Sequence, residues 1–286
     1  MTTSSAAAPA GPAPAAPAKP RKPRYPATVK RIEQLTPRMV RVTFTSTELA
    51  DFGWSGPAAH LKLIFSSAEP TLPTAASSSG AAASAASAGA SSEPPRPTMR
   101  TYTPRRFDRD SRELDVDFVL HGEGPASTWA SQAAVGQTLT VAGPGRNYVV
   151  DPGADWFVLA GDDSAIPAIA TILEQLPPTA QVTVFIEVVD AKDEHRISAA
   201  SNATVTWLHR GEDNKIAGTL LEARLRDLQL PPGSGRIYVA CESGAMRRIR
   251  RHLLTERSLS RDHVVTRGYW KLGATDHPDG DYGQDV

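Results

Sequence analysis

The pattern of predicted secondary structure changes once along this chain, near residues 147–154. Before that point, alternating and β-branched stretches follow one another as predicted strands, and the only predicted helix is short, near 126–133. After it, short apolar runs alternate with helical patterns, which is typical of a parallel sheet with helices on both faces. The sequence therefore predicts two domains, a small antiparallel β-barrel over 25–147 and an α/β parallel-sheet, Rossmann-like domain over 148–286 that includes a C-terminal extension.

Two stretches of low complexity are predicted to lie outside both cores. Residues 1–24 are rich in Ala and Pro, and residues 66–97 are rich in Ala and Ser. Both have little to bury, so we expect a disordered tail and a disordered insertion in a loop of the barrel. The positive charges of the tail lie at its end, unlike those of a secretory signal, and no run approaches the ~18 apolar residues of a membrane helix. We therefore expect a cytoplasmic protein that does not enter a membrane.

The charge and cysteine content restrict the classes of ligand. The 31 Lys and Arg residues balance 31 Asp and Glu residues, so no overall field favours nucleic acid, and an anionic ligand must meet a local basic patch. Cys241 is the single cysteine, which excludes an intrachain disulfide and a cysteine-ligated iron–sulfur cluster. The seven histidines do not cluster with cysteine or carboxylates at ligand spacing, so we expect no metal bound by the protein itself.

The stretch Arg100-Thr101-Tyr102-Thr103 carries the most distinctive chemistry of the first domain. Arg100 offers a planar fork of donors for a pyrophosphate, Tyr102 a flat ring, and Thr103 a hydroxyl, and a flavin dinucleotide needs all three. On a strand, residues 100 and 102 face one side and residue 103 the other, so the strand must bend or end near Thr103, where Pro104 follows. The alternative is an edge strand with a solvated arginine and a half-buried tyrosine.

A glycine-rich turn follows about twenty residues later, from His121 to Ala130. Its glycines allow the backbone to approach a ligand closely. Ser127 or Thr128 could cap a short helix, whose free N–H groups would face a phosphate. This turn and Arg100 together predict one pyrophosphate held from two sides, as in FAD.

Together, the pattern Arg-x-Tyr-Thr-x-Arg over 100–105 and the pattern His-Gly-x-Gly-Pro-Ala-Ser-x-Trp-Ala over 121–130 resemble the siderophore-interacting proteins. That family consists of FAD-dependent ferric-siderophore reductases within the ferredoxin–NADP reductase superfamily. Three later stretches also look like the family: 161–169, 207–211 and 267–273. The resemblance implies an enzyme that passes electrons from NADPH or NADH through FAD to a ferric siderophore.

The resemblance implies an FAD site built from both motifs of the barrel. Tyr102 and Thr103 would lie against the reactive ring as the catalytic pair, with the Thr103 hydroxyl at the flavin N5 atom. His121 would stack beside the flavin or cap the loop, rather than act as a catalytic acid or a metal ligand. The implied FAD-binding residues are Arg100, Tyr102, Thr103, His121, Gly124, Ala126 and Ser127.

The resemblance also implies a nicotinamide-cofactor site in the second domain. The turn at 161–164 would receive the pyrophosphate through its backbone N–H groups, because its two aspartates would repel phosphate, and Ser164 would cap the helix. Two alternatives stay open: His209 and Arg210 either meet an adenosine phosphate or end a strand in solvent, and Glu242 either orients the nicotinamide or holds a helix terminus. The implied residues are Gly161, Asp162, Asp163, Ser164, His209, Arg210 and Glu242.

Three basic residues are candidates for binding an anionic ferric chelate, namely Lys62, Arg146 and Arg247. Lys62 lies in a stretch that looks like the family's His-Val-Lys-Leu, and Arg146 follows a Gly-Pro-Gly where the family also places arginine. For Lys62 and Arg247 the alternative is an ordinary solvated side chain. Two rival functions also stay open: a flavin reductase or oxygenase reductase component, and a non-enzymatic module that binds flavin or chelate. We expect a monomer.

Overall fold

The computed structural model describes residues 22–65, 97–122, 124–198, 202–212, 216–278 and 280–284. The tail predicted over 1–24 and the insertion predicted over 66–97 lie almost wholly outside these ranges. Arg24, which the prediction assigned to the tail, is instead the first residue of a strand, because its backbone pairs with Ala142 in the first sheet.

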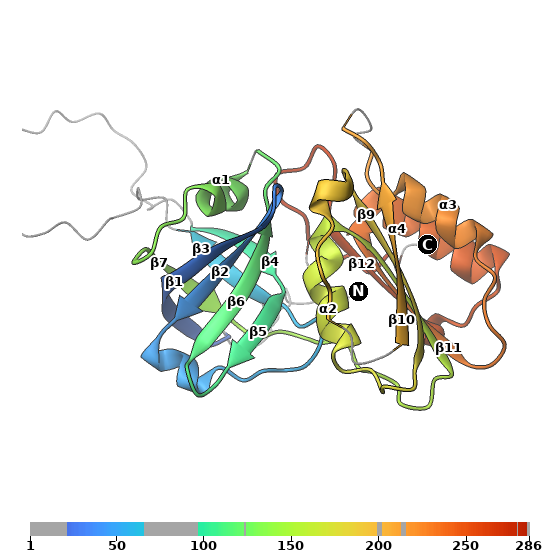
Figure 1. Cartoon of the computed structure of the whole chain (residues 1–286), viewed down its shortest axis with the longest axis horizontal. Coiled ribbons are helices and arrows are strands. Elements are labelled where there is room, and N and C mark those ends of the chain that lie inside the picture. The colour runs from blue at the N-terminus through green and yellow to red at the C-terminus, as the bar shows by residue number, and fades with distance from the viewer. Residues whose placement is uncertain are drawn as a thin grey trace, which may run out of the picture.

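The first domain is built on a seven-stranded antiparallel sheet with the order β4-β3-β7-β1-β2-β6-β5 (Figure 1). Its strands are β1 (Arg24–Thr36), β2 (Met39–Thr45), β3 (Leu61–Phe65), β4 (Thr98–Tyr102), β5 (Pro104–Asp108), β6 (Glu113–Val119) and β7 (Thr138–Ala142). The outermost strands of this order, β4 and β5, are separated in sequence only by Thr103, so the sheet curls back on itself as a half-barrel. Phe44, Leu63 and Phe118 are fully buried inside it. The prediction of an antiparallel barrel-type domain is confirmed.

Two short helical segments complete this domain. The helix α1 (Pro125–Ser131) packs against β2 and β6 close to the predicted position, and the 3-10 turn η1 (Thr47–Asp51) follows β2.

The second domain is built on a five-stranded parallel sheet with the order β10-β9-β8-β11-β12. Its strands are β8 (Trp156–Asp162), β9 (Gln181–Val188), β10 (Asn202–His209), β11 (Gly235–Glu242) and β12 (Val264–Trp270). Its helices are α2 (Ile166–Leu173), α3 (Thr219–Asp227) and α4 (Ser243–Arg251), with the short turns η2 (Asp163–Ala165), η3 (Ala191–Asp193), η4 (His252–Glu256) and η5 (Arg261–His263). Helix α2 covers the face towards the barrel, and α3 and α4 cover the other face (Figure 1). Strand order reverses between β8 and β11, which is where ligands bind in sheets of this kind.

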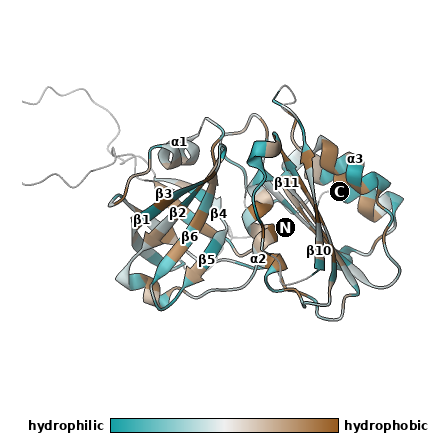
Figure 2. Cartoon of the chain, in the orientation of Figure 1, coloured by the Kyte–Doolittle hydropathy of each residue, from teal (hydrophilic) through white to brown (hydrophobic). Residues whose placement is uncertain are grey.

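The two domains share one hydrophobic core around α2. Met39 of the barrel is buried in the same cluster as Ile169 and Tyr238, and Val119 packs against it. Figure 2 shows hydrophobic stretches on α2 and on strands of both sheets. The buried hydroxyl of Thr171 on α2 accepts a hydrogen bond of 2.9 Å from the backbone N–H of Ala58 in the barrel domain.

Ion pairs reinforce this interface at its rim. Arg38 lies 2.9 Å from Asp193 and 2.8 Å from Glu212, and Arg105 lies 2.7 Å from Glu174 at the end of α2. Each pair joins a side chain of the barrel to one of the α/β domain. The relative position of the two sheets is therefore determined by core packing and by charge.

The residues that follow β12 run back along that strand. The backbone N–H of Gly268 donates to the carbonyl of Asp281 at 2.9 Å, and the Thr266 hydroxyl donates to the carbonyl of Tyr282 at 2.7 Å. Within the described ranges, no helix is long and apolar enough to cross a lipid bilayer.

Candidate functional site

The Arg-Thr-Tyr-Thr stretch lies where the first sheet turns back on itself. Strand β4 ends at Tyr102 and β5 begins at Pro104, so the predicted break in the strand near Thr103 is confirmed. The Tyr102 ring packs against Phe118 with centroids 4.5 Å apart, and burial raises the pKa of its hydroxyl. Thr103 is only 8% exposed and faces the second domain, where its side chain meets Tyr269.

Arg100 connects the barrel to the C-terminal extension. Its guanidinium donates to the carbonyl oxygen of Met99 at 2.9 Å and to that of Thr275 at 2.7 Å, and it lies 3.8 Å from a carboxylate oxygen of Asp276. Carbonyl oxygens are weaker partners for a guanidinium than phosphate oxygens, which accept charge-assisted and bidentate bonds. An anionic ligand can therefore compete for this side chain.

The glycine-rich turn presents backbone donors at the start of α1. Gly122 and Gly124 have φ angles of 82° and 91°, which other residues rarely adopt. Gly124 is the N-cap and supplies no side-chain acceptor, so the prediction that Ser127 or Thr128 caps this helix is wrong. The buried Ser127 hydroxyl instead accepts the backbone N–H of His121 at 3.1 Å and holds the turn closed.

The donor set at this end of the barrel fits the pyrophosphate of FAD. The first turn of α1, which contains the buried Ala126, has no acidic residue and no side-chain cap. The guanidinium of Arg100 adds a fixed positive charge. Uncapped N–H groups and an arginine are the kinds of donor that bind phosphate oxygens.

The turn after β8 is packed too closely for any residue larger than glycine. A Cβ atom on Gly161 would lie 2.4 Å from the Ala165 side chain and 2.6 Å from the carbonyl of Ala240. The adjacent Asp162 is fully buried, and one of its carboxylate oxygens accepts both the backbone N–H and the hydroxyl of Ser164. Asp162 rather than Ser164 is therefore the N-cap of the helical turn that follows.

The second carboxylate oxygen of Asp162 joins the end of β8 to the ends of β11 and of the edge strand β12. It accepts the backbone N–H of Glu242 and the indole N–H of Trp270, both at 2.9 Å. Burial raises the pKa of Asp162 to about 7, with a further increase from neighbouring Asp163, although these hydrogen bonds oppose the shift. Asp162 therefore points into the protein and holds the sheet edge together.

Two further carboxylates occupy helix starts along the same edge. Glu187 is fully buried at the end of β9, and it accepts the backbone N–H groups of Gly218, Leu220 and Leu221 at 2.7, 3.0 and 3.2 Å where α3 begins. Glu242 accepts the backbone N–H of Ala245 at 2.9 Å and caps α4. The prediction that backbone N–H groups of the 161–164 turn bind the pyrophosphate is wrong for Ser164, whose N–H is taken by Asp162.

Arg210 is the basic group that the structure places nearest to these carboxylates. It lies 3.4 Å from Asp163 and 4.0 Å from Glu187, and its side chain is 13% exposed. Within the described part of the chain, its Nη1 atom is buried without a hydrogen-bond partner. This orphaned donor fits a phosphate of a nicotinamide nucleotide. His209 points elsewhere and pairs with Glu194 at 2.7 Å.

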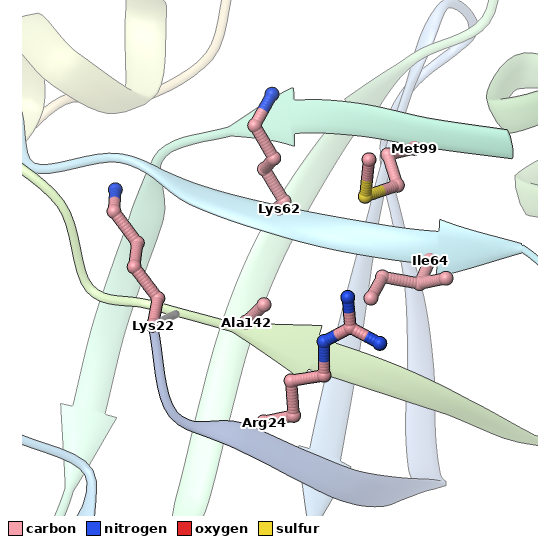
Figure 3. Close-up of a pocket in the computed structure, with 6 residues that line it drawn as sticks. All are labelled: Lys22, Arg24, Lys62, Ile64, Met99 and Ala142. Carbon is pink, nitrogen blue, oxygen red and sulfur yellow. The ribbon is translucent and has the colours of Figure 1, made fainter. Parts of the chain in front are cut away.

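The candidate substrate residues do not form one group. Lys62 donates to the Thr101 hydroxyl at 3.2 Å on the outer face of the first sheet. With Lys22 and Arg24 it borders a cavity of about 300 Å³, where the three basic side chains rise on one face (Figure 3). The rest of this cavity is lined by Ile64, Met99 and Ala142.

Arg146 borders a second cavity, of about 530 Å³, that Lys22 also lines. Lys22 therefore links Lys62 to Arg146, although composition had assigned it to the tail. Arg247 instead donates to Asp281 at 2.8 Å and to Ser243. Lys22, Arg24 and His60, which also lines the second cavity, were not among the predicted site residues.

The half-barrel with an Arg-x-Tyr-Thr junction, packed on a parallel α/β sheet, is the two-domain fold of the ferredoxin–NADP reductases. Comparison with known protein families then identifies the family within this fold. Residues 28–148 match the siderophore-interacting FAD-binding domain and residues 154–273 match the siderophore-interacting protein domain, so the chain belongs to the siderophore-interacting protein family.

Named relatives and a solved structure are similar to almost the whole chain. Ferric vibriobactin reductase ViuB of Vibrio cholerae is 34% identical over 85% of this chain and 88% of its own length. The NADPH-dependent ferric-chelate reductase of Escherichia coli is 28% identical over 85% of this chain and 91% of its own. The crystal structure of a siderophore utilization protein from T. fusca has a TM-score of 0.75 at 36% identity, covering 90% of this chain and 96% of that one.

Proposed function

We propose that this protein is an FAD-dependent reductase that uses NADPH or NADH to reduce ferric siderophores. The observation that carries the proposal is the junction of β4 and β5, which brings together Arg100, Tyr102 and Thr103 beside the second domain. The relatives named as ferric vibriobactin reductase and NADPH-dependent ferric-chelate reductase support the substrate class.

FAD, when bound, supplies the conversion of a hydride from the nicotinamide into single electrons for Fe(III). The chain's own residues bind and orient it. Arg100 and the uncapped start of α1 would hold the pyrophosphate, Tyr102 would support the ring from the barrel, and Thr103 would offer its hydroxyl to the N5 atom. Burial of Tyr102 against Phe118 fixes the plane of the supporting ring.

The α/β domain binds the nicotinamide nucleotide at the ends of β8 and β11, where strand order reverses. Arg210 meets a phosphate through the donor that lacks a partner among the described residues. The carboxylates of Asp162 and Glu242 are fully engaged with backbone donors and keep the sheet edge rigid.

The ferric siderophore is the substrate and binds at the basic rim of the barrel formed by Lys22, Lys62 and Arg146. The described residues contain no group of three His, Cys, Asp or Glu side chains that could hold a metal ion. Electron transfer therefore needs no protein ligand on iron. Fe(II) is held less tightly than Fe(III) by hard catecholate or hydroxamate oxygens, so it leaves the chelate.

Stopped-flow oxidation of NADPH and of NADH, with and without a ferric chelate, tests this function. Without a ferric chelate, a siderophore reductase oxidises only enough nucleotide to reduce its own FAD. With the chelate, oxidation of the nucleotide becomes catalytic, and the Fe(II) produced can be trapped with a chromogenic chelator. A flavin reductase instead turns over with free flavin alone, and a binding module does not oxidise the nucleotide. We also propose that the protein is cytoplasmic and monomeric. Size-exclusion chromatography with light scattering can check the oligomeric state.

Reversing the charge of Lys62 is expected to lower kcat/KM for an anionic ferric tris-catecholate by about tenfold, because a local basic patch raises the encounter rate. Flavin reduction by NAD(P)H should stay nearly unchanged, since that ligand binds the second domain. The defect should shrink with salt, because exposed charges are screened over about 8 Å at 0.15 M.

Lys192→Glu, an exposed position in the second domain, is the matched control for Lys62→Glu. It should leave both reactions unchanged. A neutral ferric hydroxamate should also be affected much less than the anionic chelate by Lys62→Glu. Equal losses on both chelates would show that Lys62 supports the barrel or the flavin and does not meet the substrate.

A further inference from the structure

One histidine contacts two of the basic residues that border the cavities of the barrel. His60 lies directly before β3 and borders the larger cavity. Its Nε2 atom lies 3.2 Å from the ammonium nitrogen of Lys22, and its Nδ1 atom lies 3.1 Å from the backbone carbonyl oxygen of Arg146. Lys22 borders both cavities, so His60 contacts the side chain that connects them.

These two partners determine which nitrogen of the imidazole carries the hydrogen. A carbonyl oxygen can only accept, so Nδ1 donates to Arg146, and an ammonium group can only donate, so Nε2 accepts from Lys22. A neutral ring with its hydrogen on Nδ1 satisfies both contacts. His60 is therefore an acceptor for Lys22, and the contact with the Arg146 carbonyl sets the direction in which it accepts.

Backbone contacts hold the segments that carry these residues. The N–H of Gly145 donates to the carbonyl of His60 at 2.6 Å, and the N–H of Gly143 donates to the carbonyl of Pro23 at 3.2 Å. The imidazole lies directly against the same loop, because a Cβ atom on Gly145 would collide with the ring. The acceptor that Lys22 meets is therefore fixed in position.

We propose that His60 is a positioning residue that holds the Lys22 ammonium between the two cavities, where it meets an anionic ferric chelate. This inference rests on the proposed function, in which the chelate binds at the basic rim. Lys22 is exposed, and none of the described residues that line either cavity is acidic. A lysine without a fixed acceptor would sample many rotamers, and ordering it on binding would lower the affinity. With His60 in place, the chelate meets a cation that is already ordered.

The test compares two amides at position 60, in the full chain loaded with FAD and at saturating NAD(P)H. Asparagine can keep the donor to the Arg146 carbonyl but is too short to reach Lys22, whereas the amide oxygen of glutamine can reach the position of Nε2. His60→Asn should raise KM for a ferric tris-catecholate about fivefold, a typical cost of ordering one long side chain. His60→Gln should keep KM close to that of the wild type.

A positioning role also predicts what does not change. Both variants should keep kcat and the rate of flavin reduction by NAD(P)H, because only the binding of the chelate is affected. His263→Asn is the matched control, since His263 lies in η5 of the second domain and borders neither cavity. It should leave KM for the chelate unchanged.

A double-mutant cycle separates positioning from general support of the barrel. In a Lys22→Met background, His60→Asn should cause no further rise in KM, because the group that it positions is gone. A further fivefold rise in that background, or equal KM values for His60→Asn and His60→Gln, would overturn the inference. If His60→Asn does not fold, His60→Phe provides the same cycle, because it fills the space of the ring without an acceptor.

The outcomes also distinguish this inference from the proposed function. A protein that reduces ferric chelates with a KM insensitive to His60→Asn keeps the function and refutes the positioning role. A wild-type protein that reduces no ferric chelate refutes both.

Discussion

Replacing Arg100 by alanine is expected to weaken FAD binding by about 10- to 100-fold, because a charge-assisted hydrogen bond contributes roughly 1.5–3 kcal/mol and each 1.4 kcal/mol is a factor of ten. The guanidinium is a fixed positive charge, and its contacts with the Met99 and Thr275 carbonyls are ones that a phosphate can replace. The dissociation constant can be measured from the quenching of FAD fluorescence on titration with apoprotein. Purified Arg100→Ala should also be paler than the wild type.

Arg106→Ala is the matched control for this prediction. Arg106 lies on β5, the next strand along the chain, its side chain is 61% exposed, and it pairs with Asp108 in its own strand. Its loss should leave FAD affinity unchanged. If both variants bind FAD as tightly as the wild type, the pyrophosphate is not held at Arg100 and the FAD site must be placed elsewhere.

Removing the carboxylate of Glu187 is expected to destabilise the protein by about 3–5 kcal/mol, the range for breaking a buried charge cluster by deleting one partner. Glu187→Ala would leave three backbone N–H groups at the start of α3 without their acceptor, and would remove one of the two carboxylates beside Arg210. Thermal and urea denaturation of the apoprotein, followed by circular dichroism, measures the effect.

Two further variants show whether the loss is specific to this carboxylate. Glu187→Gln keeps one amide oxygen as an acceptor for the helix start, so it should lower the free energy of unfolding clearly less than Glu187→Ala does. Glu33→Ala, at an exposed position on β1, should change stability by no more than about 0.5 kcal/mol. Equal stability of Glu187→Ala and wild type would mean that water replaces the carboxylate at α3.

The class of fold could be predicted because local periodicity differs between the domains. Strands of the second sheet are near-continuous apolar runs, such as Trp156–Asp162, because helices cover both faces. Strand β5 was not predicted, since Pro104, Arg105 and Arg106 break the alternation that indicates a strand. It pairs with β6, and its Arg105 reaches Glu174 at the end of α2, a partner far away in sequence.

The candidate site was predictable only where its chemistry is local. The Arg100–Thr103 stretch and the glycine turn each carry their signal within a few residues. Glu187 could not be found this way, because its three backbone partners lie 31 to 34 residues further along the chain. Lys22 was missed for another reason: the composition around it indicates disorder, while its side chain borders both basic cavities.

Helix α2 belongs to the core of both domains, and this limits how the molecule can move. Opening the domains as a hinge would separate Ala58 from Thr171, break the ion pairs of Arg38 and Arg105, and bring Met39 into water. Such a movement would resemble partial unfolding more than the swing of a lid. The electron-transfer distance between nucleotide and flavin is therefore set when the protein folds. Turnover would need only side chains and the segment after β12 to move aside, so this reductase transfers electrons without a movement of one domain against the other.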